Sequence, residues 1–344
     1  MAPSAILNSF QLGFPWQTAD PFLFCVYHQD FYPKSNGQFG PAASLAGRDI
    51  GQDFTIKDGW RMYHGQAVPG FPGHPHRGFE TVTVVEKGLI DHADSQGAAG
   101  RYGQGDVQWM TAGKGLQHAE MFPLLNENED NPAELFQIWL NLPRANKMVE
   151  PHFRMFWSED IPVVKSQDAH GKAIRVKVVA GRYGDQTPPA PPPDSWAADP
   201  SHDVAIWVIQ LEAGAEWELP AGAPGLSRRL YFFEGESLKA AGTEFQPGVG
   251  LELDSSLGLP LLNGGQTARL LLLQGRRIAE PVVQYGPFVM NSKAEIMKAF
   301  EDYQRDQFGG WPWPSSEPVH GQKGRFARYA DGREEVPFVS AQGT

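Results

Sequence analysis

Apolar and β-branched residues occur along this chain in short runs that glycine and proline separate. Residues 78–88 form one such run and end at a turn glycine, and Ile174, Val176 and Val178 alternate with other residues as in a half-buried strand. The same pattern predicts an arm or edge strand over residues 1–20 and further strands at 20–27, 60–64, 89–94, 105–110, 134–142, 204–211, 230–233 and 268–274. We therefore predict a mostly β protein.

One clear helix is predicted near the end of the chain. Ser292 and Glu295 have the spacing of a capping box, in which each side chain accepts a hydrogen bond from a backbone N–H at the start of a helix. The apolar residues that follow fall on one helical face and are Ile296, Phe300 and Tyr303. Residues 309–344 are rich in proline, glycine and charge, and this composition predicts a loosely attached tail.

The length of the chain favours two domains. With 344 residues, 41% of them hydrophobic, it exceeds the usual size of a single core and has enough apolar material for two. A weak internal repeat agrees, because residues 83–88 are echoed by 231–235, and residues 102–105 by 245–248. We predict a metal-binding domain over 1–150, a second domain over 151–290, and a helix and tail over 291–344.

The charge and the cysteine content exclude several classes of protein. There are 29 Lys and Arg against 40 Asp and Glu, and the formal net charge of -11 argues against direct binding of nucleic acid. The longest apolar runs fall far short of the roughly 20 residues that span a bilayer, so no membrane segment is predicted. The single cysteine, Cys25, and the absence of a signal-peptide pattern predict an intracellular protein, cytoplasmic and, in a eukaryote, also nuclear. Cys25 lies in an apolar run, which favours a buried, inert thiol over a reactive one.

Two short phrases carry the candidate chemistry. His74 and His76 are two residues apart, and so are His118 and Glu120. Residues two apart in a strand point to the same face of a sheet, so each phrase offers a pair of metal-capable side chains to one face. If the strands curl into a barrel, three imidazoles and one carboxylate converge and leave positions open for water, dioxygen or a substrate oxygen. The pattern predicts an open catalytic metal site.

The remaining polar residues near these phrases have weaker signals. His28, His64 and His92 are interpreted as surface or hydrogen-bonded structural residues. Glu80, or else Arg77, is a candidate for supporting a ligand by a hydrogen bond. Trp109 and Met110 are interpreted as core residues. The second copy of the repeat has no histidine between His202 and His320, and residues 221–225 stand about where the paired histidines would fall, so it is predicted to bind no metal in this way.

Two stretches that contain these phrases resemble the pirin family, a branch of the cupin superfamily. They are residues 72–83, with His74 and His76, and residues 105–121, with His118 and Glu120. Weaker matches occur at residues 20–23, 136–143 and 286–291, so the resemblance extends over roughly residues 20–310. Three segments depart from the family pattern: a long glycine-rich stretch at 32–70, a proline-rich insertion at 187–193 and an extra tail after Gly310. The insertion is interpreted as a surface loop, with a docking site for an SH3 or WW domain as the alternative.

The resemblance implies an all-β fold of two stacked antiparallel β-barrels with a short C-terminal helix, and a monomer. It implies one iron, as Fe2+, held by His74, His76, His118 and Glu120, although nitrogen and oxygen ligands also accept Cu, Ni, Zn or Mn. It further implies a quercetinase-type dioxygenase, with O2 and a flavonol-like aromatic as substrates and Glu120 as both ligand and general base. The alternative is a non-catalytic, iron-dependent redox sensor that contacts a transcription factor. Regulation of a metabolic enzyme by direct contact is a third possibility in the family.

Overall fold

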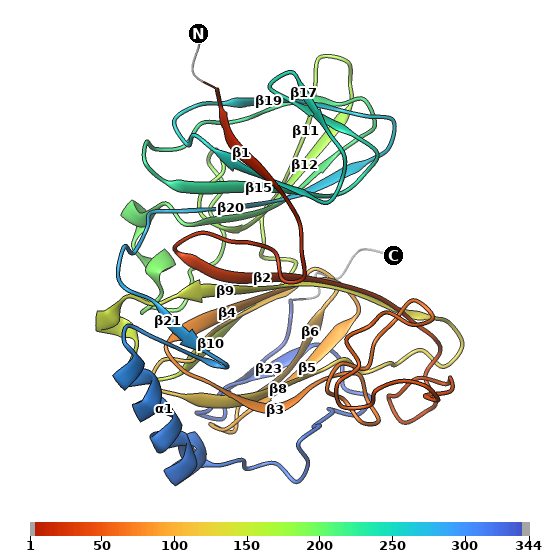
Figure 1. The fold of residues 1–344 in the computed structure, drawn as a ribbon. Coiled ribbons are helices and arrows are strands. Elements are labelled where there is room, and N and C mark those ends of the chain that lie inside the picture. The colour runs from red at the N-terminus through yellow and green to blue at the C-terminus, as the bar shows by residue number, and fades with distance from the viewer. Residues whose placement is uncertain (1–3, 339–344) are drawn as a thin grey trace. The chain divides into compact units, whose positions relative to one another are not determined.

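The computed structural model describes residues 4–338 and is built mainly from β-strands, as predicted (Figure 1). The chain forms two compact units, and each is made of three separate segments. The first, which we call the histidine unit, comprises residues 27–138, 142–159 and 280–338, and the second unit comprises residues 4–26, 139–141 and 160–279. This division differs from the predicted boundaries at 150 and 290. Two of the crossings, at 26/27 and 138/139, lie within the continuous strands 22–32 and 131–141, where no change of composition marks a boundary.

The histidine unit contains two sheets whose described ladders are antiparallel. Their β-branched and aromatic residues alternate across the pleat and build a core that includes Val85, Ile90 and Met110. One sheet has the order β10 (His152–Phe156), β7 (Val107–Thr111), β4 (Phe79–Lys87), β9 (Asn131–Asn141) and β2 (Phe22–Tyr32). The other has the order β24 (Glu334–Glu335), β23 (Phe326–Arg328), β6 (Ala99–Gly103), β5 (Leu89–Asp94), β8 (Leu116–Met121) and β3 (Gly70–His76).

The second unit also contains two antiparallel sheets around its own apolar core. The larger sheet has the order β1 (Ile6–Gln11), β18 (Val249–Leu253), β15 (Ser227–Glu234), β20 (Ala268–Gly275), β13 (Ala205–Leu211), β12 (Ala173–Ala180) and β11 (Val163–Gln167). The smaller has the order β14 (Glu216–Leu219), β19 (Leu259–Asn263), β16 (Leu238–Ala240) and β17 (Thr243–Phe245). As the repeat predicts, β15 pairs with β18 in the way that β4 pairs with β7. The predicted edge strand at the start of the chain is β1.

The predicted helix is α1 (Lys293–Asp306), and its capping box is confirmed. The Ser292 side chain accepts a hydrogen bond from the Glu295 backbone N–H, and the Glu295 carboxylate accepts one from the Asn291 backbone N–H. The apolar face packs on β22 (Phe288–Met290), which forms a hairpin with β21 (Val283–Tyr285). The remaining helical elements are short 3-10 turns, η1 (Arg144–Asn146), η2 (Trp196–Ala198), η3 (Pro200–His202) and η4 (Gln307–Gly309).

The chain after α1 is firmly attached to the histidine unit, and the prediction of a loose tail is wrong over the described residues up to 338. Its strand β23 extends the sheet of β6, and the buried Arg101 donates hydrogen bonds to the carbonyls of Gly321 and Lys323. Residues 339–344 of the predicted tail lie outside the described residues. Composition misled the prediction because proline and glycine signal irregular backbone, which here is held by hydrogen bonds.

Two smaller predictions concern residues 60–64 and Cys25. Residues 60–64 form only isolated bridges, such as that between Asp53 and Tyr63, so the short strand predicted there is wrong. The segment is held by side-chain contacts, since the Tyr63 hydroxyl bonds the buried Asp30 carboxylate at 2.6 Å. Cys25 is fully buried, as predicted, and burial raises the pKa of its thiol.

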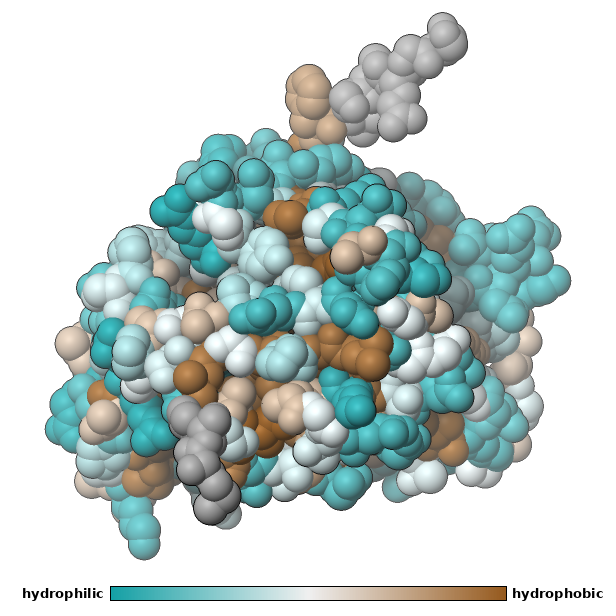
Figure 2. Space-filling model, turned by 90° about the horizontal axis from the view of Figure 1, so that it is seen from above, coloured by the Kyte–Doolittle hydropathy of each residue, from teal (hydrophilic) through white to brown (hydrophobic). Residues whose placement is uncertain are grey.

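The surface mixes polar and apolar residues. On the face seen in Figure 2, hydrophobic residues occur in several separate groups among hydrophilic ones. Large apolar side chains that are well exposed, such as Tyr285 and Met297, are far fewer than buried apolar side chains. Among residues 4–338, no helix is long and apolar enough to cross a membrane.

Candidate metal centre

The two predicted phrases lie side by side in the sheet. His74 and His76 belong to β3, and His118 and Glu120 belong to β8, its antiparallel neighbour. The register places His74 directly opposite His118, so their side chains leave the same face of the sheet. The structure therefore brings together residues that are more than forty positions apart in the sequence.

A β-bulge in β3 sets this register. Phe71 pairs with Glu120 and His74 pairs with His118, so three steps along β3 match two steps along β8. The bulge contains Pro72 and Gly73. Its carbonyl at Pro72 accepts a hydrogen bond from Nδ1 of His74 at 2.8 Å, which leaves the lone pair of this neutral imidazole on Nε2.

The three histidines form a compact group. One ring nitrogen from each of His74, His76 and His118 lies within 4.8 Å of the others, and the ring centroids are 4.5–4.9 Å apart. His76 and His118 are buried and His74 is half-buried. Among residues 4–338, neither ring nitrogen of His118 has a hydrogen-bond partner. A buried imidazole without partners is costly, and a metal ligand role would account for it.

Burial keeps all three imidazoles neutral near pH 7. It lowers the pKa of His74 to about 4, although the hydrogen bond to Pro72 opposes this effect. Burial, followed by the neighbouring His74, lowers the pKa of His76 well below its usual value. Burial and the other histidines do the same to His118. Neutral imidazoles are the form that binds metals.

Glu120 lies next to this group and is held by three side chains. Its Oε2 is 3.8 Å from Nε2 of His118 and accepts a hydrogen bond from the Gln137 amide at 2.8 Å. Its Oε1 accepts from the Thr83 hydroxyl at 3.0 Å and, at a longer 3.4 Å, from the Tyr102 hydroxyl. Burial raises the pKa of Glu120, while the nearby His92 and these hydrogen bonds oppose the rise.

The hydrogen bonds around Glu120 leave room for one more proton. The Thr83 hydroxyl lies 3.0 Å from Oε1 of Glu120 and 2.5 Å from the Gln137 side-chain oxygen, yet it has a single hydrogen to donate. When the carboxylate is ionised, only one of these two contacts can be a hydrogen bond. When Glu120 is protonated at Oε1, it can donate to Thr83, and Thr83 can then donate to Gln137.

Sequence analysis assigned His92 a structural or surface role, and the structure places it beside the site. His92 is fully buried on β5, pairs across the strands with Glu120, and has its ring 5.7 Å from that of His118. Its Nε2 lies 3.3 Å from Asp94. His92 and Asp94 are two residues apart, which is the spacing that marked the other two phrases. Sequence reasoning also missed Thr83, Tyr102 and Gln137, which carry no such spacing.

The other residues near the phrases have structural contacts. His28 hydrogen-bonds the Tyr63 hydroxyl, and His64 hydrogen-bonds the Gly51 carbonyl. Arg77 pairs with Asp302 of α1, and Glu80 accepts a hydrogen bond from Thr111. Sequence analysis proposed that Glu80 or Arg77 supports a ligand by a hydrogen bond. For His74, the supporting hydrogen bond is made with the Pro72 backbone carbonyl. Trp109 and Met110 are buried, in agreement with the core role predicted for them.

The residues present fit a single metal ion. Bonds from a metal to imidazole are about 2.0–2.1 Å long, so ligand atoms in one site lie about 3–4 Å apart. The observed spacing of up to 4.8 Å can close by side-chain shifts of about 1 Å. Three neutral nitrogens and one carboxylate suit iron and its neighbours, and they do not by themselves select one metal.

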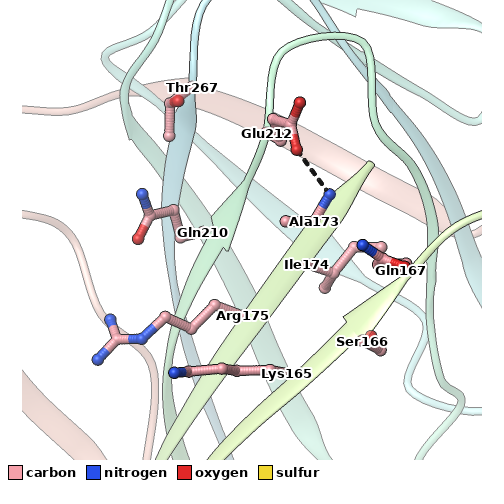
Figure 3. A pocket seen from close by; sticks show the side chains of 9 residues that line it. All are labelled: Lys165, Ser166, Gln167, Ala173, Ile174, Arg175, Gln210, Glu212 and Thr267. Carbon is pink, nitrogen blue, oxygen red and sulfur yellow. Dashed lines mark hydrogen bonds between the residues drawn. The ribbon is translucent and has the colours of Figure 1, made fainter. Parts of the chain in front are cut away.

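Several hollows lie outside the histidine group. One of about 260 Å³ in the histidine unit is lined by Leu116 of β8, Asp94 of β5 and Tyr329 of the tail. A groove of about 650 Å³ crosses β11, β12 and β13 of the second unit, and Figure 3 shows that Lys165 and Arg175 extend along one side of it. The residues that line this groove include no histidine.

Comparison with known proteins decides the family. The pirin family model matches residues 16–140, and the model of the pirin C-terminal cupin domain matches residues 206–309. The chain belongs to the pirin family. The first match contains all four predicted ligands, and the resemblance and the two-cupin fold are thereby confirmed. Both matches end before the tail.

Named relatives of this pirin-family chain extend over most of its length. A pirin-like protein of Caulobacter vibrioides is 39% identical over 240 residues, which are 70% of this chain and 80% of the relative. A Pseudomonas aeruginosa protein, provisionally named a quercetin 2,3-dioxygenase, is 38% identical over 245 residues, or 70% and 79% of the two chains. A crystal structure of quercetin 2,3-dioxygenase from Acinetobacter baumannii superposes with a TM-score of 0.69 at 28% identity and covers 89% of this chain and 98% of its own.

Proposed function

We propose that this protein is a metal-dependent dioxygenase of the quercetinase type, with iron held by His74, His76, His118 and Glu120. The observation that carries the proposal is His118, a buried histidine whose two ring nitrogens have no hydrogen-bond partner among the described residues and which lies between two further neutral histidines and a carboxylate. The likeness to a solved quercetin 2,3-dioxygenase supports a flavonol or a similar small aromatic as the substrate.

The metal, held by His74, His76, His118 and Glu120, would supply positive charge that stabilises the deprotonated 3-hydroxyl of the flavonol and would make electron transfer to O2 possible. Glu120 takes the proton of that hydroxyl as general base. In the metal-free protein, burial raises the pKa of the Glu120 carboxyl, and the carboxylate form that accepts a proton is held by hydrogen bonds. Gln137 and Thr83 hold the carboxylate in place, and the Thr83 hydroxyl can turn to Gln137 once Glu120 is protonated.

The overall reaction balances without a further reductant. The heterocycle of the flavonol opens, both oxygen atoms of O2 enter the products, and one carbon leaves as carbon monoxide. The proton taken by Glu120 returns to the ring-opened product. The remaining histidines bind and orient, and their low pKa values keep them from competing for this proton.

The test combines metal analysis with oxygen uptake. The purified protein, a His74→Ala/His76→Ala variant and a Glu120→Gln variant are loaded with Fe2+, and O2 consumption is followed as quercetin is added. We expect near-stoichiometric iron and quercetin-dependent uptake in the parent protein, no retained iron in the double variant, and retained iron with little uptake in Glu120→Gln. A His170→Ala variant is the control, because His170 is an exposed residue of the second unit.

Two outcomes would overturn the proposal in different ways. Equal metal content in the parent and the double variant would remove the metal site itself. Stoichiometric iron without uptake on a panel of flavonols would keep the site and refute the dioxygenase. It would then favour the redox-sensing role in which the metal reports its oxidation state through protein contacts.

A further inference from the structure

The chain that follows α1 makes contacts that the proposed function does not use. Residues 310–325, which we call the strap, connect η4 to β23 and lie outside both family matches. In Figure 1 the strap is part of the blue chain that leaves α1, passes below β3 and returns to β23. A segment that the family models do not include is thus packed on the sheet that holds the histidines.

One part of the strap is anchored on β5. The Trp313 indole N–H donates to the Asp94 carbonyl at 2.8 Å, and Nε2 of His320 lies 2.8 Å from the His92 carbonyl. The His320 backbone N–H donates to the buried Asp91 carboxylate, which also pairs with Arg101. These bonds fix the strap on β5, which is the neighbour of the ligand strand β8.

Another part is anchored on β3 and on the residues before it. The Ser316 carbonyl accepts a hydrogen bond from the Gly73 backbone N–H at 2.8 Å. The Trp311 ring packs on Gly73 so closely that a Cβ at this position would lie 3.3 Å from the ring. The Glu317 carboxylate accepts from the backbone N–H groups of Gln66 and Ala67. The strap therefore touches the bulge that lies directly before His74.

The two hydrogen bonds at this bulge share one peptide group. The carbonyl of Pro72 and the N–H of Gly73 belong to the same planar unit. The Pro72 carbonyl oxygen accepts the hydrogen bond of His74 Nδ1, and the Gly73 N–H donates to the Ser316 carbonyl of the strap. Because the plane is rigid, the strap fixes the direction of the carbonyl that orients the imidazole. Hydrogen bonds in such a chain also polarise one another.

We propose that the strap orients His74 for metal binding through the Pro72–Gly73 peptide, with Trp311 and Glu317 as the positioning residues that hold it there. This inference rests on the proposed metal site. Groups that orient a ligating histidine typically raise metal affinity by about 10- to 100-fold. The strap would supply this support to His74, the one of the four proposed ligands that is only half-buried.

The experiment measures metal affinity apart from activity. The dissociation constant for Co2+ is determined by competition with a chromophoric chelator for the parent protein, Trp311→Ala and Glu317→Ala. We expect both variants to bind Co2+ about 10-fold or more weakly and to change its visible absorption spectrum, which reports ligand geometry. Glu317→Ala removes no buried packing, and it serves if Trp311→Ala does not fold.

The matched control is Arg325→Gln. Arg325 also anchors the strap, but it pairs with Asp106 and Glu159, neither of which is on β3 or β8. We expect this variant to lower the melting temperature and to leave Co2+ affinity unchanged. A double variant, Gly73→Ala with Trp311→Ala, should show non-additive losses, because both changes act on the same contact.

Three results would overturn the inference. Folded Trp311→Ala and Glu317→Ala variants that bind Co2+ as tightly as the parent would show that the strap does not act on the site. An equal loss in Arg325→Gln would mean that any loosening of the strap lowers affinity, so that the contact at Gly73 is not special. A parent protein that binds no metal would refute the proposed function first and this inference with it.

Discussion

Replacing Gln137 by Leu is the most direct test of the role given to Glu120. The Gln137 amide donates to Oε2 of Glu120 at 2.8 Å, and Oε2 is the carboxylate oxygen that lies 3.8 Å from His118. Leucine has a similar size and no donor. The substitution removes this bond to the ionised carboxylate and also a weaker, neutral bond from Thr83 to Gln137 that forms when Glu120 is protonated. Because the bond to the charged group is the stronger of the two and burial is unchanged, the pKa of Glu120 rises further.

The size of the shift follows from the strength of the lost bond. A hydrogen bond to a charged group contributes about 1.5–3 kcal/mol, and one pKa unit corresponds to about 1.4 kcal/mol, so the expected rise is about one to two units. A general base must be ionised to accept a proton, and activity is lost as the pH falls through its pKa. The acidic limb of the pH profile of kcat/KM should therefore move to higher pH by about one to two units.

The assay is quercetin-dependent O2 consumption by the iron-loaded parent and variant across the pH range. Gln117→Leu is the matched control, because it makes the same change on β8, and the Gln117 side chain hydrogen-bonds Tyr303 and the Gln307 carbonyl. An acidic limb that stays in place or moves to lower pH in Gln137→Leu would refute Glu120 as the base. So would an equal shift in Gln117→Leu.

Three further predictions concern stability. In the unfolded state His74 has its ordinary pKa of about 6.5, whereas burial in the folded state lowers this pKa to about 4. The free energy of unfolding of the metal-free protein should therefore fall by about 2 kcal/mol from His74 alone between pH 7 and pH 5. Urea unfolding of the parent and of His74→Gln at the two pH values measures this difference. Ser292→Ala removes the side-chain cap of α1, and urea unfolding should show that the free energy of unfolding falls by about 1 kcal/mol. Ser292→Asp keeps a capping oxygen and should show no loss. Gly115→Ala places a Cβ 2.7 Å from the Phe308 ring, at a backbone position whose φ is 134°. We expect the free energy of unfolding to fall by about 1–3 kcal/mol. Adding Phe308→Ala should restore only part of this loss, because the backbone strain remains. An unchanged unfolding midpoint in any of the three would contradict the corresponding contact.

The site residues were predicted from the sequence where one local rule was enough. Alternation along a strand puts His74 and His76 on one face, and it does the same for His118 and Glu120, wherever the strands lie. The rule cannot show which strands are neighbours. It would have marked His92 and Asp94 by their spacing, but only the pairing of β5 with β8 places them beside Glu120.

The residues that hold Glu120 could not have been found in this way. Thr83 and Gln137 belong to β4 and β9 of the facing sheet, so their contacts depend on how two sheets pack. The bulge at Pro72 and Gly73 is equally hidden, since a register shift is a property of a strand pair. The capping box of α1 was predicted correctly because its contacts lie within four residues of one another.

The predicted boundaries at 150 and 290 differ from those of the two compact units for a related physical reason. A boundary can be read from a sequence when a linker of different composition marks it, whereas here the strands β2 and β9 continue without a break where the chain changes unit. The tail was misjudged because its anchors are backbone carbonyls and indole N–H groups, such as that of Trp313. Neither kind of group is visible in the proportion of proline and glycine.

The place of β23 in the sheet has a consequence for the order in which the protein is made. The ligand strands β3 and β8 and their neighbours β5 and β6 leave the ribosome early, but the strand that covers the edge of β6 lies at residues 326–328. Until these residues are synthesised, β6 presents an unpaired edge, which is a known starting point for aggregation. The sheet that holds the histidines therefore reaches its final pairing only after residues 326–328 have been synthesised. Metal is therefore best supplied to the protein after its synthesis. Truncation that removes β23 would lower the yield of soluble protein, because it leaves the edge of β6 unpaired.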